Sequence, residues 1–313
     1  MFRFILHRLG MAVPTLLLIS VIVFALIRLI PGDPALLMLG DMADPQSLAD
    51  MRSSLGLDHS VVSQYLIWIK SVLSGDLGVS ISSRQPVLEL LVERFSVSAT
   101  VVLVSVLLAT LLAVPVGLLA ARVQNRAQDL GLGATGTLLL SVPSFWLGLL
   151  LLYVFGIQLG WLPVIGYVGF ASDPLKAVTY VVLPIITLTL VEFGAIARMA
   201  RASTIEVLRL EYIAHARAKG LSESAVLWRH ALRNAFAPTW TLIGLILGNL
   251  LGGIAVLETV FTLPGIGRLM VDAIFSRDYP VLQGCLLLIT CIYVLVNLLV
   301  DLLYPLFDPR VKL

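Results

Sequence analysis

The sequence predicts an all-α membrane protein with six transmembrane helices. Of its 313 residues, 59% are hydrophobic and only 13% are charged, and the mean hydropathy is +1.00. A soluble domain carries about 25% charged residues. Several uncharged apolar stretches also reach the roughly 20 residues that a helix needs to cross a hydrocarbon core of about 30 Å. Together, these observations exclude most soluble classes of protein.

Charge-free windows define the expected spans, which are residues 9–27, 95–121, 130–160, 177–197, 235–257 and 279–300. The basic start, MFRFILHRLG, would suit a signal peptide, but no small-residue cleavage site closes the apolar stretch that follows. We therefore expect a retained first helix. Pro14, Pro115, Pro143 and Pro184 are expected inside helices, where neighbouring helices can satisfy the freed backbone groups.

The spans divide the chain into four parts, and the placement of Lys and Arg sets their orientation. With the N-terminus inside, thirteen basic residues lie on the cytoplasmic side and eight on the other side. Both termini of this multi-pass protein are therefore expected in the cytoplasm. The parts are an N-terminal tip with the first span (1–30), an external segment (31–94), a transmembrane core (95–305) and a cytoplasmic tail (306–313).

The external segment contains the stretch SVVSQYLIWIKSVL, whose apolar residues recur at helical spacing from Val62 to Leu73. This pattern favours an amphipathic helix that lies along the membrane or packs on the spans. A direct contact with a ligand is the alternative.

The longest cytoplasmic loop, residues 198–236, carries seven Lys or Arg residues and is called the basic loop below. We predict a continuous helix over 204–218, a left-handed Gly220 at its end and a second helix capped by Ser222. Pro238 would then begin the fifth span. Two interpretations stay open: the charges only set topology and bind anionic lipid, or an ordered turn docks a cytoplasmic partner.

The stretch EYIAHARAKGLS…RHALRNAFAP, within residues 211–238, resembles the cytoplasmic loop of inner-membrane permeases of the peptide/nickel family of ATP-binding-cassette (ABC) importers. His215, Phe236 and Ala237 depart from the residues usual in that family. Similarity continues in family order through IPGDPA at 30–35, LGLD at 55–58, GDLGVSI at 75–81, ETVFTLPGIGR at 258–268, RDYPVLQ at 277–283 and NLLVDLLYPLFDPR at 297–310.

The resemblance implies the type I ABC importer permease fold, with a cytoplasmic coupling helix that inserts into a cleft of an ATPase subunit. It also implies a second related permease, two ATPase subunits, an external substrate-binding protein and the bacterial inner membrane. The ATPase-coupling residues would be Glu211, Tyr212, His215, Ala216, Arg217, Lys219, Gly220, Arg233 and Asn234.

The chain itself is not expected to be an enzyme or to bind a cofactor. None of its four lysines follows a glycine, so it has no G-x-x-x-x-G-K-[ST] loop to cradle ATP phosphates. ATP and Mg²⁺ would be held by the partner ATPases. Membrane lipid is an expected partner, and nucleic acid is not.

Polar residues inside spans are candidates for the translocation pathway. They include Glu192, which could instead pair with Arg198, and Asn249 with its neighbours Gly248 and Gly252, which could instead serve helix packing. Asn297 and Asp301 are expected to tether helices. Cys285 and Cys291 are expected to be free thiols. The four histidines lack metal-ligand spacing, so we expect no metal site; they are His7, His59, His215 and His230.

The expected function is to form half of the translocation pathway of an ATP-driven importer of dipeptides or oligopeptides. Nickel chelates and glutathione are alternative substrates. Two alternatives belong to other classes: a secondary transporter driven by an ion gradient, and a membrane scaffold that transports nothing.

Overall fold

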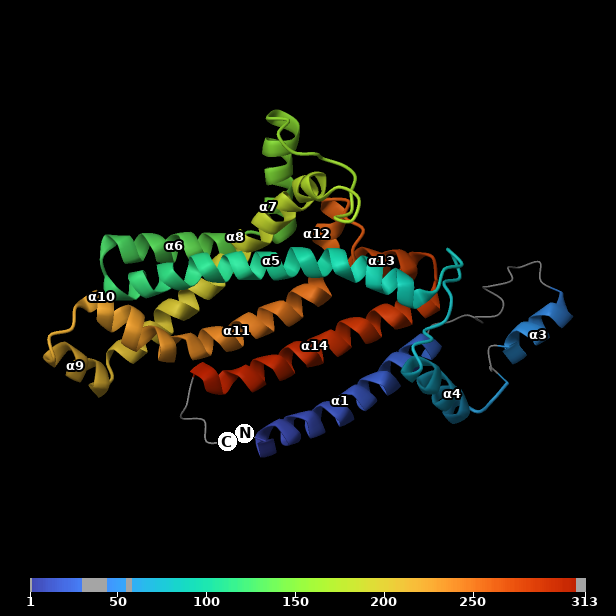
Figure 1. Cartoon of the computed structure of the whole chain (residues 1–313). Coiled ribbons are helices and arrows are strands. Elements are labelled where there is room, and N and C mark those ends of the chain that lie inside the picture. The colour runs from blue at the N-terminus through green and yellow to red at the C-terminus, as the bar shows by residue number, and fades with distance from the viewer. Residues whose placement is uncertain (1, 30–43, 55–57, 308–313) are drawn as a thin grey trace.

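The computed structural model describes residues 2–29, 44–54 and 58–307, and it shows long helices that run side by side (Figure 1). The helices in these ranges are α1 Phe2–Leu29, α3 Pro45–Ser54, α4 Val61–Leu73, α5 Val87–Arg122, α6 Ala127–Ser141, α7 Ser144–Leu151, η1 Leu152–Gln158, α8 Pro174–Leu208, α9 Glu211–Ala218, α10 Glu223–Ala225, η2 Val226–Ala231, α11 Leu232–Gly253, α12 Ala255–Val260, α13 Ile266–Phe275 and α14 Tyr279–Phe307. The segments η1 and η2 are π-helices.

Within the described ranges, five helical segments are long and apolar enough to cross a membrane. They are α1, α5, α8, the α10–α11 segment and α14. A sixth candidate is the pair formed by α6 and α7–η1, which is bent by 95°. The prediction of six spans is therefore met when the bent pair is counted as one span. The prediction that Pro143 lies inside a helix is wrong.

The bend lies at Val142 and Pro143, between α6 and α7 (Figure 1). Val142 is extended, with ψ of 123°, and Pro143 is the N-cap of α7. A proline lacks the backbone N–H that a continuing helix needs, and its ring disfavours a helical conformation in the preceding residue. The local chemistry therefore ends α6 and lets α7 leave in a new direction.

Other predicted boundaries also shift. The helix α5 begins at Val87, inside the segment predicted to be external. The helix α11 begins at Leu232, so Pro238 lies inside this helix rather than at its start, and it ends at Gly253, before α12. The motif at residues 30–35 and the end of the tail, 308–313, lie outside the described residues.

The helices α5 and α8 form the central pair of the bundle. Val101, Val102 and Ile196 are fully buried between the helices of this core. The Ser105 hydroxyl donates to the carbonyl of Ile185 at 3.2 Å, and the Thr189 hydroxyl donates to the carbonyl of Ser105 at 3.3 Å. Polar groups inside a membrane need protein partners, and these hydrogen bonds supply them across the α5–α8 interface.

The helices α1 and α14 pack together on the outer side of α11 (Figure 1). Arg8 of α1 forms an ion pair with Asp301 of α14 at 2.6 Å. The prediction that Asp301 tethers helices is thus confirmed, whereas Asn297 donates to the carbonyl of Tyr293 within its own helix. The Phe307 ring lies 4.9 Å from that of Phe236, near the start of α11.

The predicted amphipathic helix is α4, and it packs on α1. Ser60 caps it by accepting from the backbone N–H of Ser63, and Tyr65 shares a 2.8 Å hydrogen bond with Ser20 of α1. The rings of Tyr65 and Trp68 lie 5.3 Å and 5.5 Å from that of Phe24. Apolar side chains such as Val62 remain exposed on its other face.

Two buried carboxylates hold the end of the bundle opposite α9. Asp278 accepts hydrogen bonds from Ser80 at 2.6 Å and from the Ser82 hydroxyl at 2.9 Å. Glu258 accepts from the Ser98 hydroxyl at 2.5 Å and from the backbone N–H of Arg268 at 2.8 Å. Burial raises the pKa of the Glu258 carboxyl, and these hydrogen bonds oppose that shift.

Candidate functional site

The first residues of the basic loop, 198–208, form the end of α8, and the loop continues as the separate short helix α9 (Figure 1). The predicted continuous helix over 204–218 is therefore wrong. Leu210 is extended, with ψ of 148°, although the stretch contains no Gly or Pro. The break lets α9 bury Ile213 and Ala216 against the core that also includes Val226. Tertiary packing overrides local helix propensity here.

The turn after α9 has the geometry that the sequence predicts. Gly220 has a positive φ of 80°, its N–H donates to the carbonyl of Arg217, and the N–H of Leu221 donates to the carbonyl of Ala216. These bonds form a Schellman motif, which ends a helix with a left-handed residue. The Ser222 hydroxyl caps the following helix by accepting from the N–H of Ala225, so both local predictions are confirmed.

An ion pair bridges the two sides of this turn. The Nε and Nη2 of Arg217 donate to the two carboxylate oxygens of Glu223 at 2.8 Å and 3.1 Å. The pair is partly exposed, so its contribution to stability is small. The two hydrogen bonds join the end of α9 to the start of α10 across the turn. Sequence reasoning placed Arg217 at an ATPase surface and missed this partner six residues away.

Side-chain hydrogen bonds also connect α9 to η2 and to the start of α11. The Tyr212 hydroxyl accepts from the side-chain amide of Asn234 at 2.8 Å and donates to the carbonyl of His230 at 3.3 Å. Ser203 of α8 donates to the carbonyl of Ala235 at 2.7 Å. These contacts connect α8, α9, η2 and α11 by side-chain hydrogen bonds.

The nine residues predicted for coupling therefore divide into two groups. One group holds α9 and its turn in place: Tyr212, Ala216, Arg217, Gly220 and Asn234. The other group is exposed on the surface of the loop: Glu211, His215, Lys219 and Arg233. Figure 1 shows α9 at one end of the bundle.

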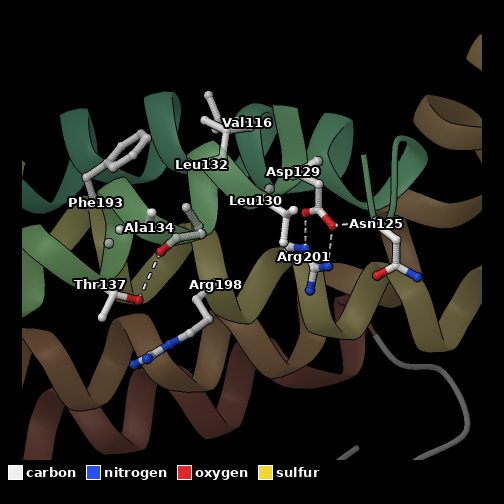
Figure 2. A pocket seen from close by; sticks show the side chains of 16 residues that line it. Val116, Asn125, Asp129, Leu130, Leu132, Ala134, Thr137, Phe193, Arg198 and Arg201 are labelled. Carbon is white, nitrogen blue, oxygen red and sulfur yellow. Dashed lines mark hydrogen bonds and ion pairs between the residues drawn. The ribbon is translucent and has the colours of Figure 1, made fainter. Parts of the chain in front are cut away.

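A second ion pair joins α6 to the part of the basic loop that lies in α8. Arg201 of α8 contacts both carboxylate oxygens of Asp129, with Nη2 at 2.6 Å from Oδ2, and the backbone N–H of Asn125 donates to the same oxygen at 2.9 Å. Figure 2 shows this pair in a cavity of about 360 Å³, with Arg198 pointing elsewhere. Sequence reasoning missed the pair. The available signal was a single acidic residue, Asp129, at the start of an apolar window.

The residues predicted for a translocation pathway do not form a cluster of bonded polar groups. An added Cβ at Gly248 would lie 2.5 Å from the Tyr293 ring, so this glycine serves packing between α11 and α14. Asn249 and Gly252 are exposed. Glu192 is half-buried, and in the described part of the chain it makes no ion pair with Arg198. Among those residues, no group of three His, Cys, Asp or Glu side chains could hold a metal ion.

Fold and site together define a multi-pass, all-helical membrane protein with a firmly attached helix projecting at one end. Residues 113–313 match the family of binding-protein-dependent transport system inner membrane components, and residues 1–104 match the N-terminal region described for such components. The chain belongs to this family of transport permeases, and its fold is the type I ABC importer permease fold.

Curated relatives align over almost the whole chain. The chain is 41% identical to a putative peptide transport system permease protein of Brucella abortus over 308 residues, 98% of each protein. It is 40% identical to the dipeptide transport system permease protein DppB of Escherichia coli K12, covering 100% of this chain and 99% of that protein. A probable peptide ABC transporter permease of Sinorhizobium fredii is also 40% identical, over 99% of each chain.

Proposed function

We propose that the chain is one permease subunit of an ATP-driven importer of small peptides, and that α9 is the helix that docks a separate ATPase. The printed names of the relatives, which are peptide and dipeptide permeases, support the substrate class. The attachment of α9 to α11 through Tyr212 and Asn234 is the observation that carries the docking proposal. A topology-setting cluster of charges would need no such attachment.

The complete transporter would contain a second related permease, two ATPase subunits that hold ATP and Mg²⁺, and an external substrate-binding protein. ATP binding would draw the ATPases together and displace α9. Because α9 is tied to α11 by side-chain hydrogen bonds and to α8 by only two linking residues, Arg209 and Leu210, its displacement would tilt both spans. The permease pair would then open toward the external side to receive the peptide.

The same proposal places the chain in the bacterial inner membrane with α9 and both termini in the cytoplasm. The excess of basic residues on that side supports the orientation. Two contacts support the proposed position of the termini: Arg8 of α1 pairs with Asp301 of α14, and Phe307, at the end of α14, packs against Phe236 near the start of α11. The start of α11, where Phe236 lies, directly follows the basic loop.

Cysteine labelling tests this orientation. Ser83 and Ser224 are exposed at opposite ends of the bundle, so each can be replaced by cysteine in a variant that lacks Cys285 and Cys291. In intact cells, we expect an impermeant thiol reagent to label the cysteine at 83 and to spare the one at 224 until the membrane is opened. Labelling of 224 in intact cells would place α9 outside and remove the docking proposal.

A single hydroxyl tests the attachment of α9. Tyr212→Phe removes the oxygen that bonds Asn234 and His230 but keeps the ring. A hydrogen bond of this kind contributes about 0.5–1.5 kcal/mol, so we expect stimulation of ATP hydrolysis by the peptide-loaded binding protein to fall several-fold. The ATPase should still copurify with the chain.

The matched control is Tyr180→Phe, because the Tyr180 ring lies near Gly166, far from α9 along α8. We expect this variant to behave like the wild type. Equal stimulation in Tyr212→Phe and Tyr180→Phe would mean that the Tyr212 bond does not transmit force. Failure of any ATPase to copurify with the wild-type chain would refute the docking proposal itself. Capture of a nickel chelate or glutathione by the binding protein would correct the substrate class.

A further inference from the structure

A polar cavity of about 340 Å³ lies beside the basic loop, separate from the cavity around Asp129. Four segments of the chain meet there: the end of α5, the turn before α6, the end of α8 and the α9–α10 turn. Each contributes one arginine, and the apolar floor comes from neighbouring residues. The arginines are Arg122, Arg126, Arg209 and Arg217, and the floor is Ala121, Ile205, Leu208 and Leu227.

The positive charge of this cavity is not balanced by the protein. Glu223 is the single carboxylate in its lining, and both oxygens of that carboxylate are already bonded to Arg217. Within the part of the chain that the structure describes, the side chains of Arg122, Arg126 and Arg209 have no hydrogen bond or ion pair. Four guanidinium groups therefore share this cavity with one carboxylate, Glu223, which also attracts Arg122, and a net charge of +3 remains.

Helix ends explain only part of this arrangement. Arg122 lies in the last turn of α5 and Arg209 caps the C-terminus of α8, where the helix dipole favours a cation. Arg126, however, is the N-cap of α6, where the dipole disfavours a cation, and its side chain makes no capping hydrogen bond. An external anion would stabilise Arg126 together with the other two arginines.

The position of the cavity indicates which anion. The cavity begins at Ala121 and Arg122, at the end of the predicted second span in α5, where a membrane-spanning helix is expected to reach the lipid headgroups, and its floor is apolar. Arg217 follows the buried residues Ile213 and Ala216 on α9, so the cavity is on the side of α9 that faces the spans. The exposed residues Glu211 and His215 lie on the other side. An Arg fork matches the geometry of phosphate oxygens.

We propose that this cavity is a binding site for the phosphate headgroup of an anionic phospholipid, held by Arg122, Arg126 and Arg209 beside the Arg217–Glu223 pair. Basic pockets between membrane helices on the cytoplasmic side are known to bind such headgroups. The bound lipid would fill the wedge between the α5–α6 turn and the α9–α10 turn. This site lies outside the ATPase contact proposed above, and lipid binding can be measured with no transport partner present.

Native mass spectrometry of the full-length chain in detergent tests the site. The chain is titrated with dioleoylphosphatidylglycerol or with dioleoylphosphatidylcholine, which has the same tails. The test variant is Arg126→Gln/Arg209→Gln. The control is Lys219→Gln/Arg229→Gln, which removes the same charge from residues of the basic loop outside the cavity. Each basic residue near the membrane surface contributes about 1 kcal/mol to the binding of an anionic lipid, and every 1.4 kcal/mol changes the affinity about tenfold. The test variant loses two such residues, so it should bind phosphatidylglycerol about thirtyfold more weakly.

The expected result is one preferentially retained phosphatidylglycerol on the wild type, its loss in the test variant and at most a threefold change in the control. Equal losses in the two variants would show diffuse attraction and overturn the site. Displacement of the lipid by an equal concentration of inorganic phosphate would assign the cavity to a soluble anion instead. Unchanged lipid binding with loss of the copurifying ATPase in the test variant would assign the arginines to an acidic surface of that partner.

Discussion

Gly220→Val is expected to abolish most ATP-driven uptake while the chain still inserts into the membrane. Gly220 has φ of 80°, and an added Cβ would meet no atom within 4 Å, so the space around it is open. The penalty is therefore conformational: a left-handed backbone costs roughly 1–2 kcal/mol for residues with a Cβ, and more for a β-branched one. The turn would then open, and the two Schellman hydrogen bonds that end α9 would be lost.

Asparagine at the same position is the matched control, because it adopts the left-handed conformation more readily than other residues with a side chain. At equal membrane levels, we expect Gly220→Asn to keep most uptake and Gly220→Val to lose at least tenfold. The measurement is uptake of a labelled dipeptide together with the amount of ATPase that copurifies. If the valine variant transports as fast as the asparagine variant, the conformation of this turn has no part in coupling.

Arg201→Ala is expected to have the largest effect on stability. The Asp129 side chain is only 2% exposed, and Arg201 contacts both of its oxygens, one of which also accepts from the backbone N–H of Asn125 (Figure 2). Removing Arg201 leaves a carboxylate with a single hydrogen bond, and because Arg201 is itself partly exposed we expect a cost of about 1–3 kcal/mol. We expect α6 to detach from α8, which would lower the midpoint of thermal unfolding in detergent and expose the turn at residues 123–126 to protease.

Two variants separate the lost ion pair from lost charge. Arg198→Ala removes an exposed arginine three residues earlier, from the lining of the same cavity, and should change stability by less than about 0.5 kcal/mol. The double variant Arg201→Leu/Asp129→Leu should regain much of the loss, because apolar residues of similar volume can replace a buried pair. If Arg201→Ala unfolds at the temperature of Arg198→Ala, the ion pair does not hold α6.

The features that sequence reasoning recovered are those with local causes. The presence of the membrane spans can be predicted from the apolar windows of the sequence. The turn at Gly220 and the helix cap at Ser222 can be predicted because each depends on residues only a few positions apart. The features it missed depend on contacts across the fold. The helix predicted over 204–218 is interrupted at Leu210, and this interruption allows Ile213 to be buried against residues that are distant in the sequence, such as Val226. Asp129 pairs with Arg201, which lies 72 residues away in the sequence.

Pro143 is a different kind of error. The residue carries a strong local signal for a break, and the expectation that neighbouring helices would absorb it was wrong, since the chain bends there by 95°. The pathway residues show the limit of reasoning from residue type alone. Residue type made both Gly248 and Asn249 candidates for the translocation pathway. In the structure their surroundings differ, because Gly248 packs against Tyr293 whereas Asn249 is exposed.

Peptide uptake by right-side-out membrane vesicles tests the central proposal, that α9 couples a separate ATPase to import. The vesicles contain the chain with its partner permease and ATPases, and the binding protein and labelled dipeptide are added outside. We predict that uptake requires hydrolysable ATP inside the vesicles, stops with a non-hydrolysable analogue and continues when a protonophore and a sodium ionophore collapse the ion gradients. Uptake that follows an imposed ion gradient without ATP would contradict the proposal and identify a secondary transporter.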